Sequence, residues 1–241
     1  MNTVAVIDYG MGNLRSVSKA VECAGWPEWW RKLRMTRLRS LCKVIEQIAS
    51  KRVHVDLTSD PRIIRRADRV VFPGQGAIGG CMAALESDSL REALLDAMKT
   101  KPFLGICLGL QALYDFSEEG GGTPCLSLLA GAVKRFPSDK MTDRTTGLPL
   151  KVPHMGWNQV RQTMPHPLWK GIPQDTRFYF VHSFYAESSD SRQVTGETEY
   201  AVRFTSAAAR ANLFAVQFHP EKSQRNGLRL LDNFMSWDGS Y

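Results

Sequence analysis

Residues 101–111 read Lys101-Pro-Phe-Leu-Gly-Ile-Cys-Leu-Gly-Leu-Gln111, an apolar run that leads into a Gly-x-Cys-x-Gly motif. We expect a buried strand at 103–106 that turns sharply into a helix from Leu110 to Phe116, a nucleophile elbow. Glycines flank such a bend because side chains there would collide, and Cys107 would adopt a strained backbone conformation. The helix N-terminus beneath the thiol would favour the thiolate. A buried structural cysteine in an ordinary turn is the alternative, because the motif is short.

The N-terminal half of the chain alternates short apolar runs with helical stretches. Strands are predicted at 3–8, 52–57 and 69–72, and helices at 13–24 and 89–99. This alternation predicts an α/β fold, a flavodoxin-like open sheet that is mainly parallel and has helices on both faces. Ligands of such sheets bind at the carboxyl ends of the strands, where the elbow and the loop 73–76 should lie.

After Gly120 the pattern changes. Three glycines at 120–122 and Pro124 predict a surface loop, and the later apolar runs are shorter and hairpin-like. We expect antiparallel additions to the sheet in the C-terminal half, because no linker marks a second domain. Residues 1–241 are therefore predicted to form a single domain. The expected strands lie at 132–136, 178–181, 200–204 and 213–218, and a closing amphipathic helix at 227–237.

The composition is that of a soluble globular protein, with 43% hydrophobic and 23% charged residues. No apolar run is long enough to cross a bilayer and the start lacks signal-peptide features, so we expect a cytoplasmic protein without membrane contact. Five cysteines, an odd number without a C-x-x-C spacing, suggest neither a disulfide framework nor a zinc site. We predict no metal and no cofactor.

The net charge of +7 is concentrated in one segment. Residues 26–57 hold eight Lys/Arg and three Asp/Glu, which leaves 23 basic and 21 acidic residues elsewhere. The basicity is local and does not indicate a nucleic-acid-binding protein. A basic binding module built around residues 26–51 is the non-enzymatic alternative.

A cysteine nucleophile needs a base, and the surroundings of His219 are the most informative of the five histidines. An apolar strand ends at His219, and Pro220 disfavours a helical conformation at the residue before it. Glu221 can accept a hydrogen bond from the imidazole, fix its tautomer and stabilise its protonated form. A strand-capping histidine with a surface glutamate nearby is the structural alternative.

The tetrahedral intermediate of acyl transfer also needs an oxyanion site. Two glycines let the loop Pro73-Gly-Gln-Gly76 approach a ligand closely, and the N–H of Leu108 is the usual second donor after a nucleophile. Taken alone, the loop is better explained as a simple turn after a strand.

With these pieces the chain resembles the class I, or triad, glutamine amidotransferases, which use Cys, His and Glu in that order. More narrowly, it is similar to the family of glutaminase subunits of imidazole glycerol phosphate synthase, from histidine biosynthesis, apart from residues 26 to about 51. The motifs that carry this resemblance are Ile7-Asp-Tyr-Gly-Met-Gly-Asn-Leu14, Pro73-Gly-Gln-Gly-Ala77, Gly105-Ile-Cys-Leu-Gly-Leu-Gln111, Pro153-His-Met-Gly-Trp-Asn158, Phe178-Tyr-Phe-Val-His-Ser183 and Gln217-Phe-His-Pro-Glu-Lys222.

The resemblance implies that Cys107 attacks the side-chain amide of L-glutamine. His219 would protonate the departing ammonia, and water activated by His219 would release glutamate from a thioester. Several members of the family have Val where this chain has Gln75, a departure that leaves the backbone role of the loop intact. The residues that match glutamine-binding and oxyanion positions are Gly74, Gln75, Gly76, Leu108, Gln111, His182, Ser183 and Phe184.

The resemblance also implies a partner in a heterodimer, a (β/α)₈-barrel cyclase subunit that makes imidazole glycerol phosphate and AICAR and receives the ammonia. A shielded route would keep ammonia from being protonated in water. Internal packing is the alternative role for Trp157 and Tyr179. The residues that match positions at or near the docking face are Asn13, Met155, Trp157, Asn158, Tyr179 and Lys222.

Residues 26–51 do not fit the family pattern, in which the first helix reaches the second strand within a few residues. Apolar residues of this segment fall on roughly one helical stripe, with most basic residues elsewhere, so we expect a basic helical insertion away from the site. Deletion of residues 27–50 should then leave activity near normal. Another class I amidotransferase, or a related cysteine hydrolase with a different acceptor, remains the alternative function.

Overall fold

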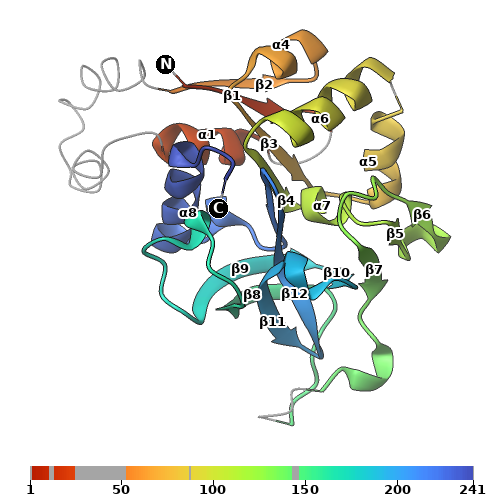
Figure 1. The fold of residues 1–241 in the computed structure, drawn as a ribbon. Coiled ribbons are helices and arrows are strands. Elements are labelled where there is room, and N and C mark those ends of the chain that lie inside the picture. Colours follow the sequence, from red (N-terminus) through yellow and green to blue (C-terminus); the bar gives the residue numbers. More distant parts are fainter. Residues whose placement is uncertain (1, 11–13, 25–52, 87, 143–146, 241) are drawn as a thin grey trace.

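A computed structural model of the chain describes residues 2–10, 14–24, 53–86, 88–142 and 147–240 (Figure 1). Asn13 and the predicted basic insertion at 26–51 lie outside the described residues, so the predictions made for them stay predictions.

Parallel strands form the centre of the sheet, in the order β2 (Val53–Thr58), β1 (Asn2–Ile7), β3 (Arg69–Gly74), β4 (Phe103–Cys107) and β13 (Leu213–Val216). Each neighbouring pair in this series is parallel. The inner strands are short and largely apolar, and all residues of β4 are buried, as expected for a sheet covered on both faces. The edge strand β2, Val53-His-Val-Asp-Leu-Thr58, is more polar and less buried. The order 2-1-3-4-13 follows the flavodoxin-like pattern, which confirms the expected fold class.

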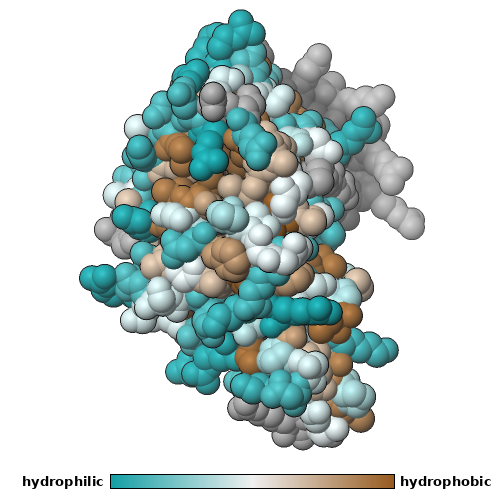
Figure 2. All heavy atoms as spheres, turned by 90° about the vertical axis from the view of Figure 1, so that its right-hand side faces the viewer, coloured by the Kyte–Doolittle hydropathy of each residue, from teal (hydrophilic) through white to brown (hydrophobic). Residues whose placement is uncertain are grey.

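Helices cover both faces of this central sheet (Figure 1). On one face α1 (Leu14–Ala24) and α8 (Gln224–Ser236) pack together, and their apolar stripes contact Val4, Val6 and Ile106. On the other face lie α4 (Pro61–Arg66), α5 (Ile78–Ala84) and α6 (Asp88–Thr100). The alternation of β1 side chains between the two clusters follows from the period of two of a strand. Seen from the side of α5 and β6, hydrophilic side chains cover much of the surface, with hydrophobic ones gathered in patches between them (Figure 2).

The C-terminal half adds antiparallel strands, as expected. Next to β13 lie β12 (Val202–Arg210), β10 (Phe184–Ser188) and β7 (Gly131–Arg135), and then the short β5 (Phe116–Ser117) and β6 (Thr123–Pro124). The pairing of β5 with β7 is the parallel exception in this series. A second branch leaves β12 through β11 (Val194–Tyr200) to β8 (His154–Gln162) and β9 (Thr176–His182). Short 3₁₀ turns complete the described chain at η1 (Glu119–Gly121), η2 (Ser138–Lys140), η3 (Pro167–Trp169), η4 (Ser191–Gln193) and η5 (Pro220–Lys222).

Two predicted boundaries are wrong. The strand predicted at 200–204 spans a turn, because Tyr200 ends β11 and Ala201, with φ of +56°, reverses the chain into β12. The helix predicted from Leu110 to Phe116 is instead α7 (Leu108–Gln111), followed by turns. The strands β5, β6, β8, β10 and β11 and the short helices α4 and α5 were not predicted. The sequence of β8, His154-Met-Gly-Trp-Asn-Gln-Val-Arg-Gln162, has few of the β-branched residues that mark a strand.

The register of the central strands brings distant residues together at the carboxyl edge. Gly74 pairs with Cys107 across β3 and β4, and Val216 pairs with Ile106 across β13 and β4. The residue after Val216 therefore lies next to Cys107, and the turn that carries His219 follows at the same edge.

Candidate active site

The elbow at Cys107 has the geometry that the sequence predicts. Cys107 adopts φ of 55° and ψ of −107°, a conformation that costs a non-glycine residue roughly 1–3 kcal/mol. A Cβ atom on Gly109 would lie 1.9 Å from the backbone oxygen of Phe72, and one on Gly105 would lie 2.9 Å from the oxygen of Gly109. Both flanking glycines are therefore required by close backbone approach.

The helix after the elbow is shorter than expected, at four residues. A single turn carries little of the aligned dipole of a long helix. The expectation that this helix N-terminus favours the thiolate therefore loses most of its force, and stabilisation of the sulfur must come from other groups.

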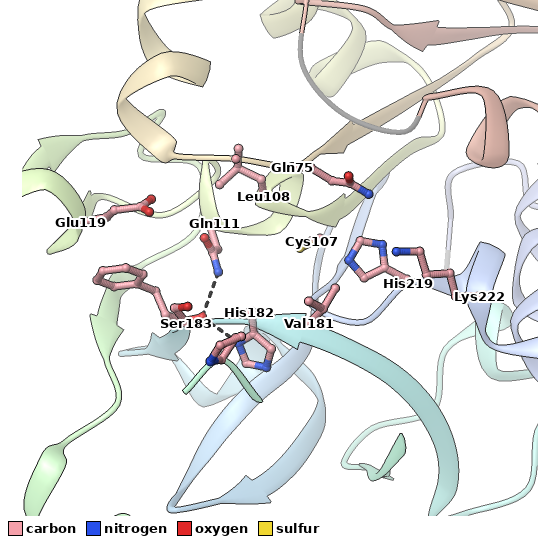
Figure 3. A pocket seen from close by; sticks show the side chains of 13 residues that line it. Gln75, Cys107, Leu108, Gln111, Glu119, Val181, His182, Ser183, His219 and Lys222 are labelled. Carbon is pink, nitrogen blue, oxygen red and sulfur yellow. Dashed lines mark hydrogen bonds between the residues drawn. The ribbon is translucent and has the colours of Figure 1, made fainter. Parts of the chain in front are cut away.

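His219 and Glu221 form a buried pair at the end of β13. Their side chains are 2% and 1% exposed, and Nδ1 of His219 lies 2.8 Å from Oε1 of Glu221. His219 has an extended backbone ahead of Pro220, as the sequence predicts. Within the described part of the chain, Nε2 of His219 makes no hydrogen bond, and the ring lies beside Cys107 (Figure 3).

The electrostatics of this pair favour a protonated imidazole. Burial lowers the pKa of His219, but Cys107 and Glu221 outweigh it and raise the pKa to about 10. Because this value lies above that of an unfolded histidine, the gain in stability is complete below pH of about 6.5 and is lost as the pH rises through about 10. A thiolate at Cys107 and an imidazolium at His219 stabilise each other in this arrangement.

A cavity of about 370 Å³ opens above the elbow (Figure 3). Gly74 and Glu221 lie behind this cavity and line a small adjoining space with His219. The structure brings together most of the site residues predicted from the sequence, because the cavity wall includes Gln75, Gly76, Cys107, Leu108, Gln111, His182, Ser183, Phe184 and His219.

Several lining residues were not predicted, namely Glu119, Pro153 and Val181. Glu119 belongs to η1, and its Oε2 accepts a hydrogen bond of 2.7 Å from the N–H of Ile78 at the start of α5. In the sequence, Glu119 stands beside another glutamate before three glycines, a pattern typical of a surface loop. No local signal marks it as a pocket residue.

Gln217 was also missed as a site residue, although it belongs to the motif that ends in His219. Its side chain is fully buried, and Nε2 lies 3.6 Å from the sulfur of Cys107. A fully buried glutamine at the end of a central strand needs hydrogen-bond partners. Its position one residue after the register pair of Ile106 is the structural reason that it meets Cys107.

Two buried histidines support the wall opposite the elbow. The pKa of His154 is lowered to about 3 by burial and by His182, and burial lowers the pKa of His182 to about 4, so both rings are neutral at pH 7. His182 Nδ1 lies 2.7 Å from the Phe184 oxygen, and its Nε2 lies 2.9 Å from Nδ1 of His154. Since a carbonyl only accepts, His182 carries its proton on Nδ1 and its Nε2 accepts from His154.

The predicted docking residues beside the cavity are here called the docking surface (Met155, Trp157, Asn158, Tyr179 and Lys222). Met155, Trp157 and Lys222 are exposed, whereas Asn158 and Tyr179 are half-buried. Met155 is 62% and Trp157 44% exposed, so Trp157 is not an internal packing residue. The rings of Trp157 and Tyr179 are 6.1 Å apart, and Lys222 Nζ lies 5.8 Å from the Tyr179 ring centre. Lys222 also lines the cavity, so the docking surface adjoins the site.

Across the described ranges, no group of three or more His, Cys, Asp or Glu side chains is placed to hold a metal ion. None of the described helices has the length and apolar character needed to span a membrane.

Known proteins resemble this chain over most of its length. Residues 38–237 match the family described as glutamine amidotransferase class-I. The imidazole glycerol phosphate synthase subunit HisH of Nitrosomonas europaea is 52% identical over 98% of this chain and 99% of its own. The HisH subunit of Aromatoleum aromaticum is 52% identical over the same shares of the two chains.

A solved structure shares the fold. The glutaminase domain of Trypanosoma brucei CTPS with bound acivicin superposes with a TM-score of 0.59, at 15% identity, over 99% of this chain and 95% of that chain. At this level of identity the likeness concerns the fold alone.

Proposed function

The chain belongs to the class-I glutamine amidotransferase family and, within it, to the HisH subunits of imidazole glycerol phosphate synthase, and from this premise we propose that Cys107, His219 and Glu221 are its catalytic triad. Its activity is the hydrolysis of glutamine to glutamate and ammonia in histidine biosynthesis. One observation supports the triad above all others. The elbow residue Cys107 and His219, which is paired with Glu221, line the same cavity.

In the first half-reaction the thiolate of Cys107 attacks the side-chain amide carbon of glutamine. The amide oxygen gains the charge and accepts hydrogen bonds from the N–H of Leu108 and from the backbone of the 74–76 loop. His219, protonated beside the thiolate, gives its proton to the leaving nitrogen as the C–N bond breaks. Ammonia leaves, and the glutamyl group stays on sulfur as a thioester.

In the second half-reaction neutral His219 takes a proton from water, which attacks the thioester carbon. The C–S bond breaks, glutamate leaves, and the thiolate and imidazolium pair is restored. Glu221 keeps the Nδ1 proton of His219 in place through their 2.8 Å contact, so Nε2 is the atom that exchanges protons.

Selectivity for free glutamine is supported by groups around the cavity. Gln111, His182, Ser183 and Phe184 line the cavity, and we propose that the Gln111 side chain and the backbone of 182–184 hold the main-chain end of the substrate. Glu119 adds a carboxylate on the cavity wall, and we assign it to the substrate's ammonium group, because an opposite charge stabilises that end. An amide substrate within a protein chain lacks this free ammonium group.

The partner that we propose is a (β/α)₈-barrel cyclase that binds the docking surface and receives ammonia. Exposed Met and Trp side chains beside the cavity suit the centre of such an interface. Ammonia entering neutral water would be protonated and lose its nucleophilicity, so a covered exit supports transfer. An amidotransferase with another acceptor, the alternative raised above, receives less support because the two relatives described above are both HisH subunits.

The decisive experiment measures glutamine hydrolysis with and without the cyclase subunit. Cys107→Ala should lose turnover by a factor on the order of 10⁴ or more, because the covalent route is removed. Cys125→Ala is the matched control, a buried cysteine outside the cavity, and should keep near wild-type turnover. Equal turnover in wild type and Cys107→Ala would exclude the proposed nucleophile.

A further inference from the structure

We propose that Gln217 is a positioning residue that donates a hydrogen bond from its side-chain amide to the Cys107 sulfur and holds it in the thiolate form. This inference rests on the proposed role of Cys107 as nucleophile. Gln217 is 0% exposed at the end of β13, and its Nε2 lies 3.6 Å from the sulfur. Water does not compete for the contact at a fully buried amide.

The direction of this hydrogen bond follows from a backbone carbonyl two steps away. The oxygen of Phe184 can only accept, and it lies 3.0 Å from Nε2 of Gln111. The same nitrogen lies 2.9 Å from Oε1 of Gln217 and donates its second hydrogen there. With its oxygen occupied by Gln111, Gln217 turns its NH₂ group toward Cys107, and an amide NH₂ only donates.

The Phe184 carbonyl, at the end of this series of hydrogen bonds, is itself held in place. The Phe184 oxygen accepts a second hydrogen bond from Nδ1 of His182, at 2.7 Å. His182 is neutral because burial lowers its pKa, and its Nε2 accepts from His154. Both lone-pair directions of the carbonyl are therefore used, and a flip of the Gln111 amide would place two oxygens against each other.

A donor of this kind acts on the charge of the sulfur. Hydrogen bonds to a thiolate are stronger than those to a thiol, so a fixed N–H stabilises the reactive form. The titratable groups near the sulfur are His219 from the turn after β13 and Tyr9 after β1, whose pKa burial raises so that it stays neutral. Glu119 and Lys222 line the same cavity. Unlike these groups, Gln217 does not titrate, so it donates its hydrogen bond to the sulfur at every pH.

The test compares the full chain with its Gln217→Met variant, which keeps the volume and removes the donor. Iodoacetamide alkylation of the Cys107 peptide, followed by mass spectrometry across the pH range, reports the reactive thiolate. The acid limb of the variant's profile should move up by about one pH unit, and kcat for glutamine should fall about ten- to a hundredfold. Gln162→Met is the matched control, because Gln162 donates to Ile172 and Pro173 away from the cavity, and its profile should match the wild type.

A second variant makes the result independent of packing. Gln217→Glu keeps the shape but places a carboxylate against the sulfur, so its acid limb should move further than that of Gln217→Met. Coincident profiles of wild type and both variants would overturn the proposal, even if kcat fell, because a merely structural role lowers turnover without moving the profile. Failure of the proposed function is a separate result, namely glutamine turnover that survives Cys107→Ala.

Discussion

Glu119 illustrates how a single side chain joins two elements and the substrate site. Its carboxylate accepts from the N–H of Ile78 and lines the cavity above Cys107. The contact fixes the carboxylate against the start of α5, which reduces the side-chain entropy lost on binding. A preordered negative charge at this place suits the ammonium group of glutamine.

Glu119→Gln should therefore raise KM for glutamine by about tenfold and change kcat much less, because a charge-assisted contact becomes a neutral one. Steady-state glutaminase kinetics measure both constants. Glu118→Gln is the control, since Glu118 is exposed and accepts from the N–H of Arg135. An unchanged KM in Glu119→Gln would remove Glu119 from substrate binding.

At the scale of residues, short motifs predicted Cys107, His219 and Glu221 because the neighbouring residues in the sequence indicate their roles. The elbow needs glycines two residues on each side, and Pro220 fixes the backbone at His219. Glu119 and Gln217 could not be predicted in the same way. Each depends on a contact with a residue 41 or 110 positions away, which no local pattern contains.

At the scale of elements, α7 and β3 meet backbone to backbone at the elbow. Gly109 lets α7 approach the carbonyl of Phe72, where a Cβ would lie at 1.9 Å. The nucleophile and the loop that follows β3 are thereby held as one unit. Their relative position does not depend on any flexible side chain.

Gly109→Ala should destabilise the protein by about 3 kcal/mol, because backbone must move to relieve the clash. It should also lower kcat, since the shift separates Cys107 from the 74–76 loop. Urea unfolding measures the stability change. Gly79→Ala in α5 is the control: its Cβ would meet nothing nearer than 4.0 Å, and alanine in a helix is favoured over glycine by about 1 kcal/mol. Equal stability of the two variants would contradict this account of the elbow.

The predicted elements were confirmed where burial and length gave a clear pattern, as in β1, β3, β4 and α8. The errors have physical causes. Nothing local marks Ala201 as a turn residue, because alanine seldom adopts the positive φ that it has here. The elbow helix ends early because residues after Gln111 bond back as tight turns, with Leu113 donating to Leu110.

At the scale of the whole molecule, the docking surface adjoins the cavity, because Lys222 belongs to both. The domain boundary 1–241 and the cytoplasmic location stay predictions. Val53 pairs with Asn2 at the start of β1, so it lies at the edge of the parallel sheet opposite to the one where Cys107 ends β4.

Trp157→Glu should weaken binding of the cyclase subunit by at least about tenfold, because aromatic residues at interface centres contribute most of the binding energy. Glutaminase activity titrated against the cyclase, or sedimentation of the mixture, gives Kd. Leu57→Glu is the matched control, a 41% exposed apolar residue on β2, the first strand of the parallel order. Equal loss in the two variants would show that the docking surface is placed wrongly.

The pairing of β4 with β13 has a consequence for the time at which the site comes into being. Cys107 and Gln217 are neighbours in space but lie 110 residues apart in the chain. At about 5–20 residues per second, a ribosome needs on the order of ten seconds to pass from one to the other. During that interval the emerging chain carries its cysteine without its base. Release of ammonia therefore cannot begin until His219 has been added and β13 has closed onto β4.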